Sequence, residues 1–119
     1  MPASHFYMER LREDLHREIA WAIANRVRDP RVPEVVSVLE VRLAPDTRNA
    51  TILVSIMGEK QARKEAIAGL NAAAPFIQKV VGERIKIKHF PRLYFKIDNS
   101  LDFSQHLNEL LDEIKDDLA

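Results

Sequence analysis

The sequence predicts an α+β domain in which helices cover one face of a three-stranded sheet. Long segments near the start and in the middle of the chain have apolar residues three or four positions apart, the spacing of a helix with one buried face. Three shorter segments are β-branched and apolar or alternate apolar with polar residues, as strands do. Since 119 residues fit one domain, we expect residues 1–119 to form a single domain.

The first element is a long amphipathic helix over residues 5–28, preceded by a short tail, residues 1–4. Its apolar face consists of Met8, Leu11, Leu15, Ile19, Ile23 and Val27. Ser4 is a suitable N-cap, because its hydroxyl can accept a bond from a free amide of the first turn. Asp29-Pro30 ends the helix, since a residue before proline avoids helical dihedrals.

A β-hairpin follows. Residues 35–43 are rich in β-branched and apolar side chains, and residues 50–57 alternate between two faces. Between them, residues 44–48 have turn chemistry, with Pro45 setting the first corner dihedral.

Two further helices are expected after Gly58, separated by a break at Pro75. Ala62, Ala66, Leu70 and Ala73 mark the first of them, and Ile77, Val80, Val81 and Ile85 mark the second. Pro75 lacks an N–H and disfavours a helical Ala74, so the first helix should stop there and the next should begin. The free amides of residues 76–78 would then face outward at a positive helix end, which binds phosphate readily.

The last strand is marked by Leu93, Phe95 and Ile97 in alternation with polar residues, and an acidic helix over residues 101–119 closes the chain. Residues 83–89 fit either a short strand or the fraying end of the preceding helix. The predicted order is therefore α-β-β-α-α-β plus a C-terminal helix.

The formal net charge of zero conceals an asymmetry. Residues 98–119 hold one Lys and seven Asp or Glu, so residues 1–97 hold 17 basic and 11 acidic side chains. Such a split indicates a basic surface for nucleic acid beside an acidic segment. Without cysteine, a secretory leader or an apolar run long enough for a membrane span, the chain is expected to be cytoplasmic, with no membrane or small-molecule partner.

The candidate RNA site lies at the Pro75 break and includes the cations on either side of it. The alanines before Pro75 have short side chains, which allow a sugar-phosphate backbone to approach closely. The candidate residues are Lys60, Arg63, Lys64, Ala73, Ala74, Pro75, Phe76, Gln78, Lys79, Arg84, Lys86, Lys88 and Arg92. Phe76, Phe90 and Tyr94 are candidates for stacking on bases, whereas Phe95 shares a strand face with the core. A solvated charged face and a purely structural proline break are the alternatives.

Signatures of catalysis and of cofactor binding are missing. The four histidines, His5, His16, His89 and His106, lack metal-ligand spacing, and the three glycines form no phosphate-binding loop. We therefore expect a binding protein with no cofactor, no metal and no catalytic residue.

The motifs resemble those of the bacterial ribosome-binding factor A family, which has a type II KH-like domain. The matching stretches are Asp29-Pro30-Arg31, Val54-Ser55-Ile56-Met57-Gly58, Arg63-Lys64-Glu65-Ala66, Phe90-Pro91-Arg92-Leu93-Tyr94-Phe95 and Asp98-Asn99-Ser100, within residues 5–114. Where the family has an Ala-x-Gly kink, this chain has Ala73-Ala74-Pro75. Proline cannot adopt the positive φ of glycine, so the chain departs from the family pattern there.

The resemblance implies a non-catalytic assembly factor that binds the free 30S subunit and its 16S rRNA during late maturation. It further implies support for processing of the 16S rRNA 5′ end and a role in growth in the cold. Apart from the resemblance, we expect a monomer. Three alternatives stay open: a protein-interaction module that docks a basic ribosomal protein through the acidic helix, a processing enzyme using His89, Asp98 or His106, and an acidic segment that covers the basic face.

Overall fold

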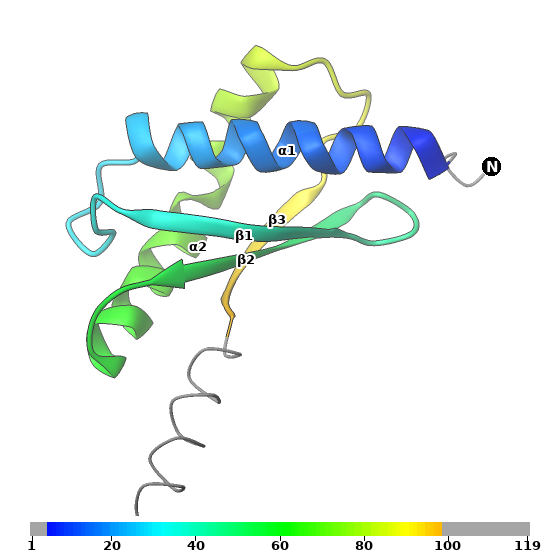
Figure 1. Ribbon diagram of the computed structural model, residues 1–119. Helices are drawn as coiled ribbons and strands as arrows, with labels where there is room; N and C mark the ends of the chain where they lie inside the picture. Colours follow the sequence, from blue (N-terminus) through cyan, green and yellow to red (C-terminus); the bar gives the residue numbers. More distant parts are fainter. Residues whose placement is uncertain (1–4, 99–119) are drawn as a thin grey trace, which may run out of the picture.

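A computed structural model describes residues 5–98, which form two helices and three strands (Figure 1). The elements are α1 (His5–Asn25), β1 (Val36–Leu43), β2 (Asn49–Ile56), α2 (Lys60–Arg84) and β3 (Arg92–Ile97). The predicted cap Ser4 and the predicted helix over residues 101–119 lie outside the described residues. Across residues 5–98, no helix is both long and apolar enough to cross a membrane.

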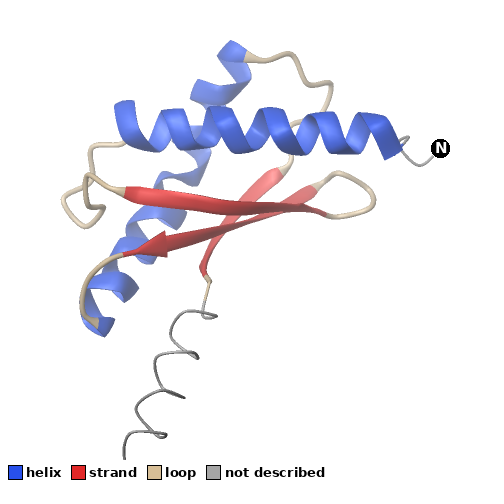
Figure 2. Cartoon of the chain, in the orientation of Figure 1, coloured by secondary structure: helices blue, strands red, loops and turns tan. Residues whose placement is uncertain are grey.

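The sheet has the order β1-β2-β3, so the hairpin strand β2 is central (Figure 2). β1 and β2 pair antiparallel, and β2 and β3 pair parallel. A parallel pair requires a crossover connection, which α2 supplies between β2 and β3. This topology confirms the predicted α+β class and the predicted hairpin.

Local chemistry accounts for the hairpin turn. The Thr47 amide donates to the Ala44 carbonyl at 2.8 Å, and the Arg48 amide donates to Asp46 Oδ1 at 3.0 Å. Thr47 adopts φ 58°, in the left-handed region. A register shift between Val38 and Glu40 inserts Leu39 as a bulge, which lets valines at both 38 and 41 face the helices.

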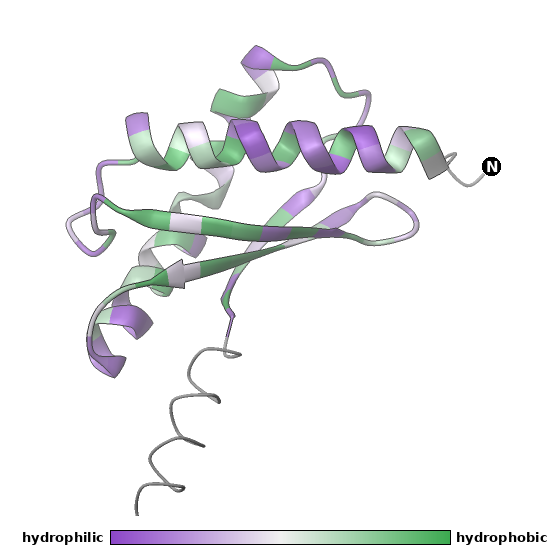
Figure 3. Ribbon diagram, in the orientation of Figure 1, coloured by the Kyte–Doolittle hydropathy of each residue, from purple (hydrophilic) through white to green (hydrophobic). Residues whose placement is uncertain are grey.

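Both helices cover the same face of the sheet, as predicted. Leu15 and Ile19 of α1, Ile52 of β2, and Leu70 and Ile77 of α2 are completely buried there. In Figure 3, hydrophilic and hydrophobic stretches alternate along the α1 ribbon, as expected for a helix in which each turn has one side toward a core. The opposite sheet face carries Arg42, Tyr94 and other exposed side chains.

The predicted break at Pro75 is wrong: α2 is one helix of 25 residues with Pro75 inside it. The described order is therefore α-β-β-α-β, with one helix where two were expected. The amides of residues 76–78 are also not free, because within a continuous helix they donate to carbonyls one turn earlier.

Tertiary packing explains this outcome. A proline inside a helix costs roughly 3 kcal/mol. On the two sides of Pro75, however, Leu70, Ile77 and Val81 are buried on one face of α2, and each such side chain contributes about 1.5–3 kcal/mol. Pro75 itself is exposed on the opposite side, where water can reach the Asn71 carbonyl that lacks its usual donor.

Two other boundaries differ from the prediction. α1 ends at Asn25 rather than at residue 28, although Val27 still packs against the core. α2 ends at Arg84, with the Ile85 amide donating to the Val81 carbonyl at 3.0 Å, and residues 85–91 form a loop rather than a strand. Residues 83–89 are thus a helix end followed by a loop.

Candidate nucleic-acid interface

One exposed line of side chains runs along the solvent side of α2 and contains both cations and small residues. Its members are Lys60, Lys64, Ala68, Ala72, Pro75 and Lys79, here called the α2 stripe. They lie three or four positions apart, which places them on one side of the helix. All six are exposed, so the continuous helix presents cations toward both ends and short side chains at its centre.

The dimensions of the α2 stripe suit a nucleic-acid backbone. At 1.5 Å per residue, Lys60 and Lys79 lie about 28 Å apart along the axis, enough for several consecutive phosphates. The short side chains of Ala68 and Ala72 keep the surface between them low. The candidate surface therefore lies along one continuous helix, whereas the sequence predicted a corner between two helices.

The other residues predicted at the corner divide between surface and interior. Ala74 is only 8% exposed and packs in the core, and Ala73 and Gln78 are half-buried. Phe76 is 42% exposed, and the guanidinium carbon of Arg26 lies 6.0 Å from its ring centroid. Of these corner residues, Pro75 and Phe76 are exposed, Ala73 and Gln78 are partly accessible, and Ala74 is out of reach of a ligand.

Arg84 is held within the fold. Its Nε donates to Glu18 Oε2 at 2.5 Å, and its guanidinium lies 3.7 Å from the ring centroid of Trp21. Glu18 is 9% exposed, so Arg84 neutralises a carboxylate that is largely shielded from water. The contacts fasten the end of α2 to α1, a role that sequence spacing did not reveal.

The cations from Lys79 to Lys96 do not form the single basic face that was predicted. Lys79 points to solvent from α2, on the helical side of the sheet, whereas Arg92 and Lys96 alternate with buried β3 residues and lie on the other side. Lys86 and Lys88 are exposed in the loop between these elements.

On the open sheet face, Arg92 and Tyr94 form a pair. Arg92 donates to the Tyr94 hydroxyl at 3.4 Å, and this contact raises the pKa of Arg92 above its usual value. Arg42 lies opposite Thr51 on the same face, and Thr51 in turn pairs with Tyr94. The open sheet face therefore also carries cations, among them Arg42, which was not among the predicted residues and whose Nη2 lies 3.3 Å from Glu40 Oε2.

Two predicted aromatic residues are engaged elsewhere. Phe95 is 4% exposed and belongs to the core, as predicted, and Phe90 packs against that core. Phe76 and Tyr94, at 42% and 46% exposure, retain accessible ring surface. Base stacking on this chain is therefore restricted to Phe76 and Tyr94 among the predicted aromatic residues.

Asn71 was missed at the level of sequence. Its side-chain amide donates to the Phe95 carbonyl at 3.1 Å, and its side-chain oxygen accepts from the Phe95 amide at 2.8 Å. The side chain thus satisfies both backbone groups of Phe95 and fixes α2 beside β3. A single asparagine in a helix gives no periodic signal, which is why the pattern did not indicate it.

Within residues 5–98, no group of three or more His, Cys, Asp or Glu side chains is placed to hold a metal ion. Among the predicted site residues, the described surface offers cations, small side chains and the accessible rings of Phe76 and Tyr94. These groups attract phosphates and stack on bases.

The ribosome-binding factor A family model matches residues 7–111. A ribosome-binding factor A of Clostridium botulinum (strain Alaska E43 / Type E3) is 36% identical over 108 residues, covering 90% of this chain and 93% of the relative. One from Acetivibrio thermocellus is 34% identical over 106 residues, covering 89% and 86%.

Solved structures show the same fold. The crystal structure of ribosome-binding factor A from Thermus thermophilus matches with a TM-score of 0.64 and 26% identity, over 75% of this chain and 93% of that one. A Thermus thermophilus homology model fitted into a cryo-electron microscopy map of a 30S complex matches with a TM-score of 0.61 and 22% identity, over 82% and 97%.

Proposed function

The chain belongs to the ribosome-binding factor A family, and on that premise we propose that it binds the free 30S ribosomal subunit through 16S rRNA during late maturation. The Thermus thermophilus protein of the same fold has been fitted into a 30S complex. The observation in this chain that carries the proposal is the α2 stripe, with Lys60, Lys64 and Lys79 around a centre of small residues.

The physical basis is attraction combined with shape. The lysines supply affinity for phosphates that does not depend on sequence, and the alanines permit the backbone to approach closely. Pro75 and Phe76 lie at the same level of the helix, so an unpaired base can stack on the accessible part of the Phe76 ring. Affinity then depends on an intact, continuous α2.

The protein acts in this proposal without making or breaking covalent bonds. It supports processing of the 16S rRNA 5′ end by holding the rRNA in one fold while other enzymes cut it. It does so in the cytoplasm, as a monomer with residues 1–119 as one domain, and it needs neither metal nor cofactor.

The salt dependence of the affinity for nucleic acid tests the proposed attraction between the lysines and the phosphates. Each phosphate neutralised contributes about −0.9 to the log–log slope of affinity against salt on duplex nucleic acid, so the three lysines of the α2 stripe alone give a slope of about −3. Co-sedimentation of the full chain with 30S subunits, 70S ribosomes and a subunit-free control should show selective travel with free 30S subunits. Equal travel in all samples would contradict the assignment.

A matched pair of variants tests the shape of the α2 stripe. Ala72→Gln adds bulk at its centre, and Ala24→Gln adds the same bulk at an exposed position of α1. Glutamine is nearly as good a helix former as alanine, so both variants should fold. We expect Ala72→Gln to weaken 30S binding at least about fivefold, in keeping with the loss of close contact, and Ala24→Gln to leave it unchanged. Equal affinities for the two variants would show that α2 does not face the rRNA.

A further inference from the structure

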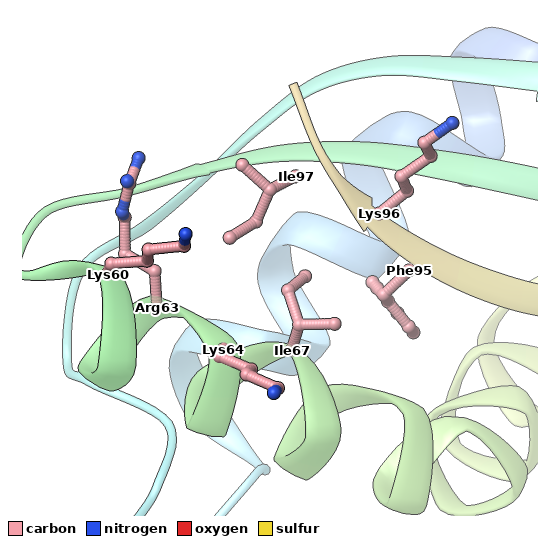
Figure 4. A pocket seen from close by; sticks show the side chains of 7 residues that line it. All are labelled: Lys60, Arg63, Lys64, Ile67, Phe95, Lys96 and Ile97. Carbon is pink, nitrogen blue, oxygen red and sulfur yellow. The ribbon is translucent and has the colours of Figure 1, made fainter. Parts of the chain in front are cut away.

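A pocket of about 350 Å³ lies between the first turns of α2 and the end of β3 (Figure 4). Its apolar part is formed by Ile67 of α2 and by Phe95 and Ile97 of β3. Lys60, Arg63 and Lys64 of α2 complete the lining, together with Lys96 of β3, whose side chain points away from α2 (Figure 4). The pocket therefore combines an apolar floor with a cationic rim.

The adjoining helix end adds positive potential. α2 begins at Lys60 after Glu59, whose side chain makes no capping hydrogen bond. The first amides of the helix thus lack a side-chain acceptor from the cap, and the positive end of the helix begins at Lys60, which also lines the pocket. An occupant with carboxylates and apolar side chains would match both parts of the pocket.

The chain itself supplies such a segment at this place. β3 ends at Ile97 in the pocket wall, and the Asp98 amide donates to the Val54 carbonyl at 3.0 Å, which fixes where the chain leaves the sheet. Residues 99–119 follow directly, with six Asp or Glu and one Lys. Their apolar residues include Leu107, Leu110, Leu111, Ile114 and Leu118, at helical spacings.

We propose that residues 99–119, hereafter the acidic segment, occupy the pocket of Lys60, Lys64 and Phe95 and compete there with RNA. The competition rests on the proposed function, because Lys60 and Lys64 also belong to the α2 stripe. Since the acidic segment is tethered at the pocket wall, it binds at an effective concentration of order mM and needs only weak contacts. RNA with many closely spaced phosphates displaces the acidic segment, so the protein binds such RNA in preference to ligands with few phosphates.

Zero-length carbodiimide coupling of the full chain tests occupancy without any RNA. The reagent joins a carboxylate and an amine that touch, with loss of water. In the monomeric fraction we expect mass spectrometry to find carboxylates of the acidic segment linked to Lys60 and Lys64, in preference to Lys79, Lys86 and Lys88. Lys96 is too near the segment in sequence to be diagnostic. Links spread evenly over all lysines, or confined to residues 79–88, would overturn the proposal.

Charge neutralisation in the full chain tests competition. Asp112→Asn with Asp116→Asn removes two charges from the acidic segment, and Glu13→Gln with Glu34→Gln removes two from exposed positions elsewhere. We expect the first variant to bind 30S subunits at least about threefold more tightly than the second. The reason is that a weaker acidic segment leaves the pocket empty in a larger fraction of the molecules, which raises the apparent affinity. Equal affinities would overturn the competition even if the cross-links are found. Failure of all proteins, wild type included, to bind subunits would instead refute the proposed function, while the cross-links would still decide occupancy.

Discussion

Substitution of Arg84 distinguishes a structural role from an RNA-binding role for the end of α2. The proposed test is Arg84→Ala, which removes the 2.5 Å hydrogen bond to Glu18 and the contact with the Trp21 ring at 3.7 Å. Glu18, at 9% exposure, would keep only the longer contact of 3.7 Å from Arg17 Nε. The variant therefore leaves a shielded carboxylate with a weaker partner.

The expected loss of stability in Arg84→Ala depends on how far the Arg84 side chain is exposed to solvent. Removing one member of a fully buried ion pair costs about 3–5 kcal/mol. The Arg84 side chain is 42% exposed, so solvent screening reduces the cost to about 1–2 kcal/mol. Loss of the cation–π contact adds about 0.5–1 kcal/mol. Together they give about 2 kcal/mol, or a fall in Tm of about 10 °C for a domain of this size.

Thermal and urea unfolding followed by circular dichroism measure this change. Lys79→Ala is the control on the same helix, because Lys79 lies at the surface and such substitutions shift stability by only about 0.5 kcal/mol. We expect Arg84→Ala to lower Tm and Lys79→Ala to lower 30S affinity. The reverse pattern, an unchanged Tm for Arg84→Ala with strongly reduced 30S binding, would refute the structural assignment of Arg84.

Two further predictions concern the loop after α1. A Cβ at Gly69 would lie 2.9 Å from Val32 Cγ2, so Gly69→Ala should lower the free energy of unfolding by about 1–2 kcal/mol. At Gly82 the nearest atom outside the helix is 3.9 Å away, so Gly82→Ala, the matched control, should raise it by up to about 1 kcal/mol. Urea unfolding measures both changes. A Gly69→Ala variant as stable as Gly82→Ala would contradict the close packing of this loop on α2. Hydrogen bonds from Arg31 lower the pKa of Asp29 from 3.8 to about 2, so the pair stabilises the fold above about pH 4 and ceases to do so as the pH falls toward 2. Arg31→Ala should move this pKa part of the way back toward 3.8 in a carboxyl NMR titration, because the backbone amide of residue 31 still donates to Asp29; an unmoved pKa would exclude the Arg31 side chain as its cause.

Much of the fold was predictable because it depends on short-range patterns. The Pro45 turn, the alternation along β2 and the helical spacing of α1 each lie within a few residues, and the structure confirms all three. The candidate site was predicted less well. Its lysines were identified by composition, but their distribution over α2, a loop and the open sheet face depends on how β3 returns beside β2.

The sequence by itself determined the element types, the hairpin, the charge asymmetry and the presence of a proline within an apolar helical pattern. Tertiary structure decided that Pro75 does not end α2, because burial of Leu70, Ile77 and Val81 against the sheet outweighs one strained turn. It also decided that Arg84 serves Glu18 and that Asn71 serves Phe95, since partners 66 and 24 residues away in the chain meet only after the layers have packed.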